Sequence, residues 1–347
     1  MNIWYNFVKF YIRIGLFFTL KNIKVHGKQN IPKKGAIIFI ANHQNALIDA
    51  LLIPTSNGRL THSLARASAF KKKLICAFLN SVNMLPIYRI RDGISTIENN
   101  YKIFEKCVEI LKNEGAIQIF AEGEHHQYRR IIPLKKGFAR IILTTLQKYP
   151  DLNIKIVPVG LNYDYHLDFP SKATVYYGEP IEANNYFNVE NPDLTYSKII
   201  KDVSSALKRL TLHINDIENY DKIKMKLEAA GVNYLNPVEA YKLLEKLDSV
   251  SPTSKKSAIN WFKPFHILTK INSVFPLLIW RYFKKTIQDI IFTNTFRFAL
   301  ILTIFPFFYL VQAGILCFIF NTKIAIIYIG ITILLGIITT KTMQISQ

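Results

Sequence analysis

Short apolar runs alternate with amphipathic stretches along the first half of the chain. Five such runs are bounded by polar positions, at residues 23–25, 36–41, 115–121, 154–161 and 173–177. Residues 96–113 and 137–147, which lie between some of them, repeat their apolar positions with the period of a helix. This alternation predicts an α/β fold, with a mixed sheet flanked by helices and functional side chains at strand ends.

The first twenty residues form a separate amphipathic pattern. Apolar side chains recur at helical spacing, at Trp4, Phe7, Phe10, Ile14 and Phe17. Lys9 and Arg13 interrupt the stretch, and no early basic region or small-residue cleavage site marks it as a signal peptide. We predict an amphipathic helix over residues 1–20 that lies in a membrane interface or, alternatively, packs on the domain.

The end of the chain holds two long apolar runs. Residues 298–320 carry no formal charge and are long enough to cross a bilayer, and residues 324–340 form a shorter run after a three-residue turn. A buried hairpin in a soluble core is the alternative. The apolar length and the terminal position favour a transmembrane helical hairpin over residues 297–341.

Basic residues flank this hairpin unevenly. It is preceded by Arg281, Lys284, Lys285 and Arg297 and followed by Lys341. Its turn holds a single lysine, Lys323. By the positive-inside tendency, both ends of the hairpin are cytoplasmic. We therefore expect an integral protein of the inner (cytoplasmic) membrane whose α/β domain, residues 21–190, lies on the cytoplasmic side.

Two segments connect that domain to the hairpin. Residues 191–250 are rich in Lys, Glu and Asp and show helical periodicity, which predicts an accessory helical segment. Residues 251–296 begin as a linker rich in Ser and Thr and continue as a basic, aromatic stretch. This second segment is typical of a polypeptide that lies on a membrane surface.

The charge of the chain supports a membrane partner. A formal net charge of +20 over 347 residues predicts an anionic binding partner. No sequence signature of a nucleic-acid-binding protein accompanies this charge. The basic residues are interleaved with aromatic ones, as in residues 261–265 and 280–285, which fits an anionic bilayer surface better. Cys76, Cys107 and Cys317 form neither a metal spacing nor an even set, so we expect no disulfide framework and a reducing compartment.

Two of the predicted strands end on residues that can carry chemistry. His43 follows residues 36–41 and Asp49 lies six positions later, while Glu122 and Gly123 follow residues 115–121. An aspartate that fixes the tautomer of a histidine allows that histidine to remove a proton from an alcohol. Alone, the same pair is also typical of a solvated loop or a helix cap. The acidic and histidine residues at 122–126 lack a second ligand cluster, so we expect no metal.

These residues stand in four blocks that resemble the glycerophospholipid acyltransferase family, the lysophosphatidate and glycerol-3-phosphate acyltransferases. The blocks are Asn42-His43 with Asp49, Leu85-Pro86-Ile87-Tyr88-Arg89, Phe120-Ala121-Glu122-Gly123 with Pro133-Leu134-Lys135-Lys136-Gly137, and Ile156-Val157-Pro158-Val159. The resemblance covers roughly residues 20–185. It implies that His43 and Asp49 are catalytic, and that the acceptor is bound by Asn42, Arg89, Arg91, Glu122, Gly123, His126 and Lys136.

The chain departs from the family pattern at two places. Five residues separate His43 from Asp49 where four are usual, a variant that the resemblance associates with acylation of glycerol 3-phosphate or dihydroxyacetone phosphate. Ala121 replaces a proline, and residues 124–126 stand where many members have Thr-Arg-Ser. Replacements for the missing arginine are available at Arg129, Arg130, Lys135 and Lys136. His126 corresponds to a histidine of the same branch.

The resemblance implies a membrane-bound O-acyltransferase of phospholipid synthesis. Such an enzyme moves a fatty acyl group from a thioester, acyl-CoA or acyl carrier protein, to a hydroxyl of glycerol 3-phosphate or its 1-acyl derivative. It needs no bound cofactor. The alternative is a non-catalytic lipid-binding membrane protein that retains the fold, and the acceptor, the donor carrier and the oligomeric state stay open.

Overall fold

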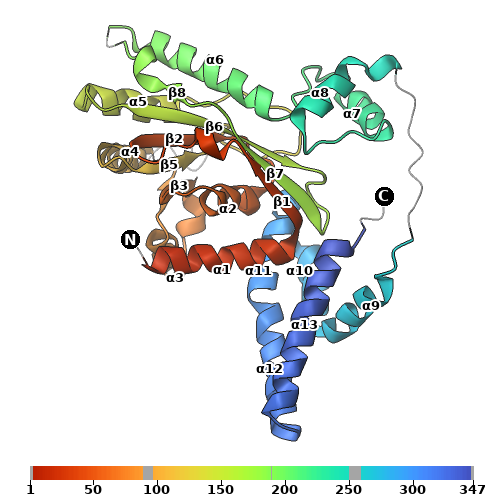
Figure 1. The fold of residues 1–347 in the computed structure, drawn as a ribbon. Helices are drawn as coiled ribbons and strands as arrows, with labels where there is room; N and C mark the ends of the chain where they lie inside the picture. Colours follow the sequence, from red (N-terminus) through yellow and green to blue (C-terminus); the bar gives the residue numbers. More distant parts are fainter. Residues whose placement is uncertain (1–2, 89–96, 189, 250–258, 345–347) are drawn as a thin grey trace.

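The computed structural model describes residues 3–88, 97–188, 190–249 and 259–344 (Figure 1). An eight-stranded sheet lies at its centre, with the strand order β1-β7-β6-β2-β5-β3-β4 and with β8 paired to β6. The strands are β1 (Leu20–His26), β2 (Ala36–Ala41), β3 (Thr61–Arg66), β4 (Met84–Ile87), β5 (Ala116–Ile119), β6 (Ile154–Tyr163), β7 (Ser171–Tyr177) and β8 (Ile181–Glu182).

The sheet is mixed, as the sequence predicts. Parallel pairing joins β6 to β2, β2 to β5, β5 to β3 and β3 to β4. β7 and β8 pair antiparallel with β6. Because β2 and β5 are parallel, the residues after both strands meet at one edge of the sheet. That edge receives the His43 and Glu122 segments.

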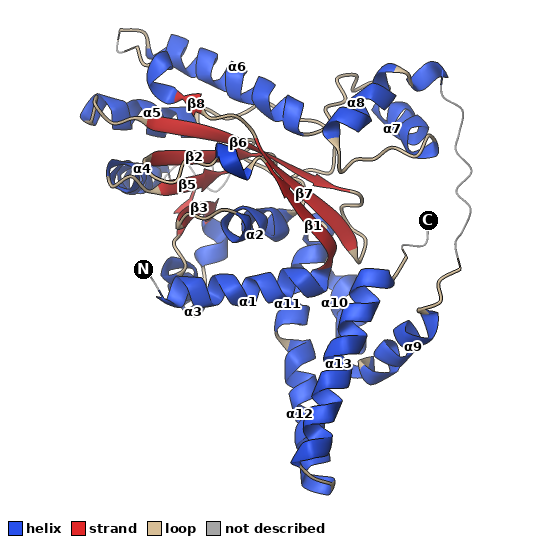
Figure 2. Ribbon diagram, viewed as in Figure 1, coloured by secondary structure: helices blue, strands red, loops and turns tan. Residues whose placement is uncertain are grey.

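Helices cover both faces of the sheet (Figure 2). Alternate residues of β2 point to opposite cores, Ile38 and Ile40 to one and Ile37 and Phe39 to the other. The first core also takes residues from α4 (Ile97–Lys112), α5 (Gly137–Lys148) and α6 (Pro192–Leu210). The second takes residues from α1 (Ile3–Thr19), α2 (Ala46–Ser56) and α11 (Thr293–Leu302). A strand that is buried on both faces explains the unbroken apolar run at 36–41.

A smaller core lies beyond α6. It joins α7 (Tyr220–Ala229) and α8 (Pro237–Glu245) through Leu212, Ile214, Tyr220 and Leu227. Asn236 caps α8 by accepting from the Val238 N–H at 3.2 Å, and Pro237 follows at the first helical position. These helices lie within the segment that the sequence predicts to be helical and accessory.

The C-terminal part contains helices and no strand in its described residues from 259 to 344. α9 (Lys263–Asn272) and α10 (Val274–Thr286) lead into α11, and α12 (Ile304–Ile319) and α13 (Thr322–Thr342) form a hairpin that extends away from the domain (Figure 1). Two helical stretches are long and apolar enough to cross a membrane, Ile290–Ile319 and Thr322–Thr342, and only 11% of the most apolar 18-residue window of each is buried in the protein. Most apolar side chains of α12 and α13 are therefore not covered by a protein core.

A break at Thr303 separates α11 from α12. Pro306 has no N–H to donate to the Leu302 carbonyl in a continuous helix, and the Tyr11 hydroxyl of α1 donates to that carbonyl instead. α1 is thereby fastened to the start of the hairpin. Figure 1 shows α1 lying along the edge of the domain where α12 and α13 leave it.

The exposed face of α1 is the apolar face that the sequence predicts. The side chains of Trp4, Phe7, Phe10, Ile14 and Phe17 are between 39% and 61% exposed. Tyr5, Val8 and Leu16 face inward and are buried. The helix thus packs on the domain with one side and presents aromatic residues outward with the other, and the membrane-interface location stays a prediction.

α3 (Lys73–Ser81) extends this exposed apolar face and was not foreseen. Leu74, Ile75 and Phe78 are exposed, and three lysines, at 71–73, stand at the start of the helix. The Trp4 indole N–H donates to the Ser81 hydroxyl at 2.9 Å, which joins the end of α3 to the start of α1. β3 and β4, which flank α3, also escaped prediction, because β3 is partly polar and β4 has only four residues.

Candidate active site

The candidate site lies in the loop between β2 and α2. Asn42, directly after β2, is fully buried, and its side-chain amide donates to the Leu161 carbonyl at 2.9 Å and accepts from the Leu161 N–H at 2.8 Å. Both of its polar groups therefore join β2 to β6. The structure therefore gives Asn42 a supporting role for His43, the residue that follows, and its amide groups are already occupied.

His43 and Asp49 are brought together as the spacing predicts. His43 Nδ1 lies 3.0 Å from Asp49 Oδ2, and the carboxylate is fully buried in the first turn of α2. When the Nδ1 proton is donated to this carboxylate, the lone pair on Nε2 is left to accept a proton from a substrate. The imidazole is 15% exposed, so it is reachable at the surface of the loop.

The five-residue spacing is accommodated by a loop that wraps around Asp49. Asp49 Oδ2 also accepts from the backbone N–H groups of Gln44 and Asn45, at 2.7 and 2.6 Å. Ala46 has a φ of +39°, a left-handed conformation that strains a residue with a Cβ atom, at the first residue of α2. The extra residue is therefore absorbed in a tight turn, and His43 lies before the helix as predicted.

Tyr163 completes the surroundings of Asp49 and was missed in the sequence. Its hydroxyl donates to Asp49 Oδ1 at 2.6 Å from the end of β6, and its ring is fully buried. Burial and the neighbouring carboxylate raise the pKa of Tyr163 well above its usual value, so it remains a donor. An apolar strand that ends on a tyrosine was the available signal.

Aromatic rings hold the His43 imidazole in place. Phe120 stacks on it with a centroid distance of 4.0 Å and an interplanar angle of 15°. His125 meets it edge to face, with the centroids 5.8 Å apart. Both residues come from the segment after β5, so the parallel pairing of β2 and β5 places them beside the histidine.

Glu122 connects the two loops of the site. The side chain is fully buried, Oε2 accepts from the His43 N–H at 2.9 Å and Oε1 accepts from the Ile132 N–H at 3.2 Å. His126 is also buried there, with Nε2 at 3.3 Å from Glu122 Oε2 and its backbone N–H donating to the His43 carbonyl at 3.1 Å. Glu122 and His126 thus hold the His43 loop in position.

Two further residues predicted to bind the acceptor, Gly123 and Lys136, lie among the described residues. Gly123 has a φ of +75°, which favours glycine, and an added Cβ would meet Lys135 at 3.1 Å. Lys136 is exposed and pairs with Asp193 at 3.1 Å. Arg89 and Arg91 lie outside the described residues.

Arg129, considered as a replacement cation, is buried inside the molecule. Its guanidinium donates to the carbonyls of Tyr163 and Asp164, at 2.7 and 2.9 Å, and lies 3.8 Å from the Tyr234 ring centroid. Burial lowers its pKa. Arg129 therefore fixes the end of β6 that carries Tyr163, a structural task that leaves it no reach toward a substrate.

Gln44 and His166 form a further support behind the loop. Gln44 Oε1 lies 2.9 Å from His166 Nε2, and Gln44 Nε2 donates to the Tyr128 carbonyl at 2.7 Å. Burial, with the nearby Arg129 charge, lowers the pKa of His166 well below its usual value. His166 is thus a neutral donor to Gln44, and it stabilises the turn that surrounds Asp49.

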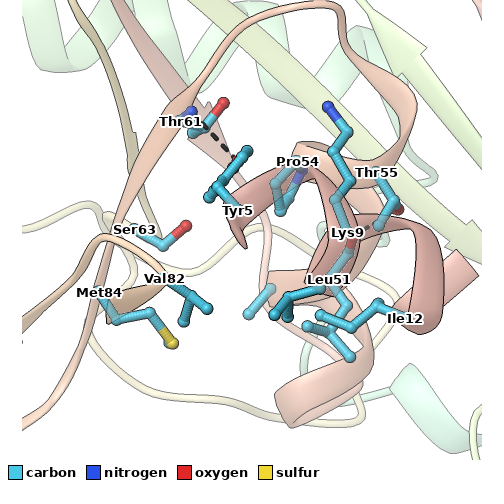
Figure 3. Close-up of a pocket in the computed structure, with 12 residues that line it drawn as sticks. Tyr5, Lys9, Ile12, Leu51, Pro54, Thr55, Thr61, Ser63, Val82 and Met84 are labelled. Carbon is cyan, nitrogen blue, oxygen red and sulfur yellow. Dashed lines mark hydrogen bonds between the residues drawn. The ribbon is translucent and has the colours of Figure 1, made fainter. Parts of the chain in front are cut away.

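A small cavity lies apart from this site, between α1, α2 and the start of β3 (Figure 3). It has a volume of about 50 Å³, and its apolar lining includes Val8, Leu51 and Met84. The Thr61 N–H donates to the Tyr5 hydroxyl at 3.3 Å across it (Figure 3). Such a space holds roughly one or two waters and does not accommodate a lipid substrate.

The chain is similar in sequence to known acyltransferases. Residues 22–162 match the family model described as Acyltransferase. The chain is 34% identical over 121 residues to glycerol-3-phosphate O-acyltransferase 1 of Saccharomyces cerevisiae, covering 33% of this chain and 16% of that protein. It is 22% identical over 343 residues to glycerol-3-phosphate O-acyltransferase 2 of the same yeast, covering 65% and 46%. The chain thus spans less than half the length of these two relatives.

Two bacterial proteins are also similar. The 1-acyl-sn-glycerol-3-phosphate acyltransferase of Bacillus subtilis is 22% identical over 203 residues, which cover 57% of this chain and 88% of that protein. The crystal structure of the 1-acyl-sn-glycerophosphate acyltransferase of Thermotoga maritima aligns with a TM-score of 0.46 and 21% identity, covering 59% of this chain and 77% of the other.

Proposed function

Since this chain belongs to the glycerophospholipid acyltransferase family, we propose that it transfers a fatty acyl group from a thioester to a hydroxyl of a glycerol phosphate. The observation that carries the proposal is the pair formed by His43 Nδ1 and Asp49 Oδ2, 3.0 Å apart at the end of a buried strand. The carboxylate has two backbone donors and the Tyr163 hydroxyl around it as well. Such a network suits a general base better than a simple helix cap.

The reaction follows from this geometry. Nε2 of His43 takes the proton from the acceptor hydroxyl, and the oxygen attacks the thioester carbonyl. The tetrahedral intermediate collapses, the carbon–sulfur bond breaks, and the proton on His43 passes to the departing thiolate. Asp49 stabilises the imidazolium between these two steps. The ester forms in one displacement, with no covalent enzyme intermediate.

The acceptor that we propose is glycerol 3-phosphate or its 1-acyl derivative. The printed names of the yeast relatives refer to the first and that of the Bacillus relative to the second. The five-residue spacing between His43 and Asp49 favours glycerol 3-phosphate. Arg89 and Arg91 are the proposed ligands of its phosphate, because guanidinium groups bind phosphate oxygens in a bidentate manner.

The donor that we propose is acyl-CoA or acyl-carrier protein, and the enzyme acts without a bound cofactor or metal. His43 and its hydrogen-bonded carboxylate supply the base that the displacement requires. The thioester supplies the activated carbonyl. No other chemical group has a necessary part in the proposed reaction.

We further propose that the enzyme is integral to the inner (cytoplasmic) membrane. The two apolar helical stretches and the exposed aromatic face of α1 support membrane insertion. Arg281, Lys284 and Lys285 before the hairpin and Lys341 after it support a cytoplasmic location for both ends. The catalytic domain would then face the compartment in which acyl thioesters are made.

A panel of substrates tests the proposal. Detergent-purified protein receives labelled acyl-CoA or acyl-carrier protein with glycerol 3-phosphate or 1-acylglycerol 3-phosphate, and the labelled ester is measured. We expect one acceptor to be preferred and the activity to be lost in His43→Ala. A chain that forms no ester with any pair, yet binds lipid vesicles, would instead support the non-catalytic lipid-binding function.

A further inference from the structure

The start of the hairpin is packed against the catalytic loops. We define the hairpin base as residues 289–297, which lie outside the stretch that matches the family model. Asn294 donates to the Asn45 side chain at 3.3 Å and to the His166 carbonyl at 2.5 Å. The Leu47 N–H donates to the Thr295 hydroxyl at 3.4 Å. The hairpin base therefore touches the turn around Asp49 and the segment after β6.

The hairpin base also contacts His125, the neighbour of the proposed base His43. Asp289 Oδ2 lies 3.2 Å from His125 Nε2, and the Phe292 ring meets the His125 ring edge to face at 5.0 Å. The His125 ring is in turn 5.8 Å from the His43 ring. One side chain thus separates a carboxylate of the C-terminal segment from the proposed base.

The orientation of the Asp289 carboxylate is fixed. Its Oδ1 accepts from the Ile291 N–H at 3.0 Å and caps the short helix at Ile290–Phe292, so that Oδ2 is turned toward His125. A carboxylate at this distance accepts a hydrogen bond from the imidazole N–H and forms an ion pair with the protonated ring. The His125 side chain is 17% exposed, so it borders the open side of the site.

We infer that Asp289 is a positioning residue that holds His125 as a cation for the phosphate of the acceptor. This inference rests on the proposed function. In glycerol 3-phosphate three carbons separate the reacting hydroxyl from the phosphate, so a phosphate ligand must lie one side chain away from His43. His125 satisfies this requirement, and Asp289 maintains its charge and orientation. The hairpin is then part of the active site as well as a membrane anchor.

Kinetics of the full-length chain test this inference. Asp289→Asn keeps the helix cap but removes the charge, and His125→Gln removes the cation. We expect each to raise the KM for glycerol 3-phosphate about tenfold with kcat changed less than about threefold. The double variant is expected to show no further increase, because the two residues act through each other. Asp216→Asn, an exposed aspartate whose carboxylate contacts Asn219, is the matched control.

A rescue variant separates positioning from a structural role. In His125→Arg the cation is charged without a partner, so Asp289→Asn is expected to have no effect on KM in that background. Equal KM values for wild type and Asp289→Asn, or multiplicative effects in the double variant, would overturn the inference.

Calorimetric binding of glycerol 3-phosphate to His43→Ala gives a second readout that needs no turnover. Weaker binding after adding Asp289→Asn supports the inference and unchanged binding overturns it. If wild type forms no ester with any substrate pair, the proposed function fails. The binding measurement tests the inference separately, because it does not depend on turnover.

Discussion

The His43 imidazole is fixed from several directions. Asp49 holds Nδ1, Phe120 covers one face and His125 meets the ring edge to face. Glu122 holds the backbone N–H of His43. A proton-transfer group gains efficiency when its orientation is set before the substrate arrives. The surrounding residues therefore have a positioning role that sequence motifs describe only in part.

Tyr163 provides the first prediction at this scale. In Tyr163→Phe, Asp49 Oδ1 loses its donor in a buried site, so we expect kcat to fall about tenfold with little change in the KM values. Tyr177→Phe is the matched control, because Tyr177 is also a buried tyrosine but contacts Ser56 at 2.7 Å instead of Asp49. Steady-state kinetics of both variants check this, and an equal loss of kcat in the two would contradict it.

The sequence predicted which residues form the pair but not what supports them. His43 and Asp49 are six positions apart, and the resemblance to the acyltransferase blocks, more than the spacing, identified them as a pair. Tyr163 and Asp289 reach the same site from 120 and 246 positions beyond His43, through pairings that only the folded sheet and the packed hairpin reveal. Glu122 was predicted as a ligand, and its carboxylate accepts from two backbone N–H groups.

At the scale of elements, the segment that contains His213 and Ile214 joins the accessory helices to the loop after Glu122. The Ile131 N–H donates to His213 Nδ1 at 2.8 Å, and the Tyr241 hydroxyl of α8 accepts from the His213 N–H at 3.0 Å. The Ile214 N–H donates to the Arg129 carbonyl at 2.9 Å. The loop that begins at Glu122 is thus stabilised from outside the sheet.

His213 makes this junction sensitive to acid. Burial, with the charges of Lys208 and Arg130, lowers the pKa of His213 to about 4. The unfolded chain binds the proton near pH 6.5, so the stability from neutral His213 is complete above that pH and is lost as pH falls toward 4. We expect the melting temperature in detergent to fall less between pH 7 and pH 5 in His213→Asn than in wild type. Parallel curves would contradict this.

Element prediction succeeded where the pattern was strong. Residues 36–41 and 137–147 were placed to within one residue, because each has a continuous or strictly periodic apolar face. β3 failed because it alternates buried polar residues such as Thr61 and Ser63 with half-buried ones. Its partners in the sheet, and not its own sequence, make it a strand.

At the scale of the whole molecule, one side of the protein collects the surfaces that suit a bilayer. α1 and α3 present exposed apolar side chains, and α12 and α13 extend from the domain beside them (Figure 1). Lys341 of α13 donates to the carbonyls of Phe17 and Leu20, at 2.8 and 2.9 Å, so the hairpin and α1 are joined. The candidate site lies next to the hairpin base.

Site-directed labelling checks this orientation. Phe10→Cys on α1 and Tyr101→Cys on α4 each replace an exposed aromatic residue. Cys76 and Cys317 are replaced by Ser, whereas buried Cys107 stays because burial raises its pKa to about 12 and keeps it unreactive. An environment-sensitive dye in vesicles should be quenched by lipid nitroxides at position 10 and not at position 101. Equal quenching at the two positions would contradict the account.

The most direct test of the central claim is the rate of ester formation by His43→Ala beside wild type, purified in the same detergent. The account predicts that the variant is slower by about 10²- to 10⁴-fold, the usual contribution of a general base, with an unchanged melting temperature. A folded variant that forms ester at the wild-type rate would contradict the assignment of His43 as the base.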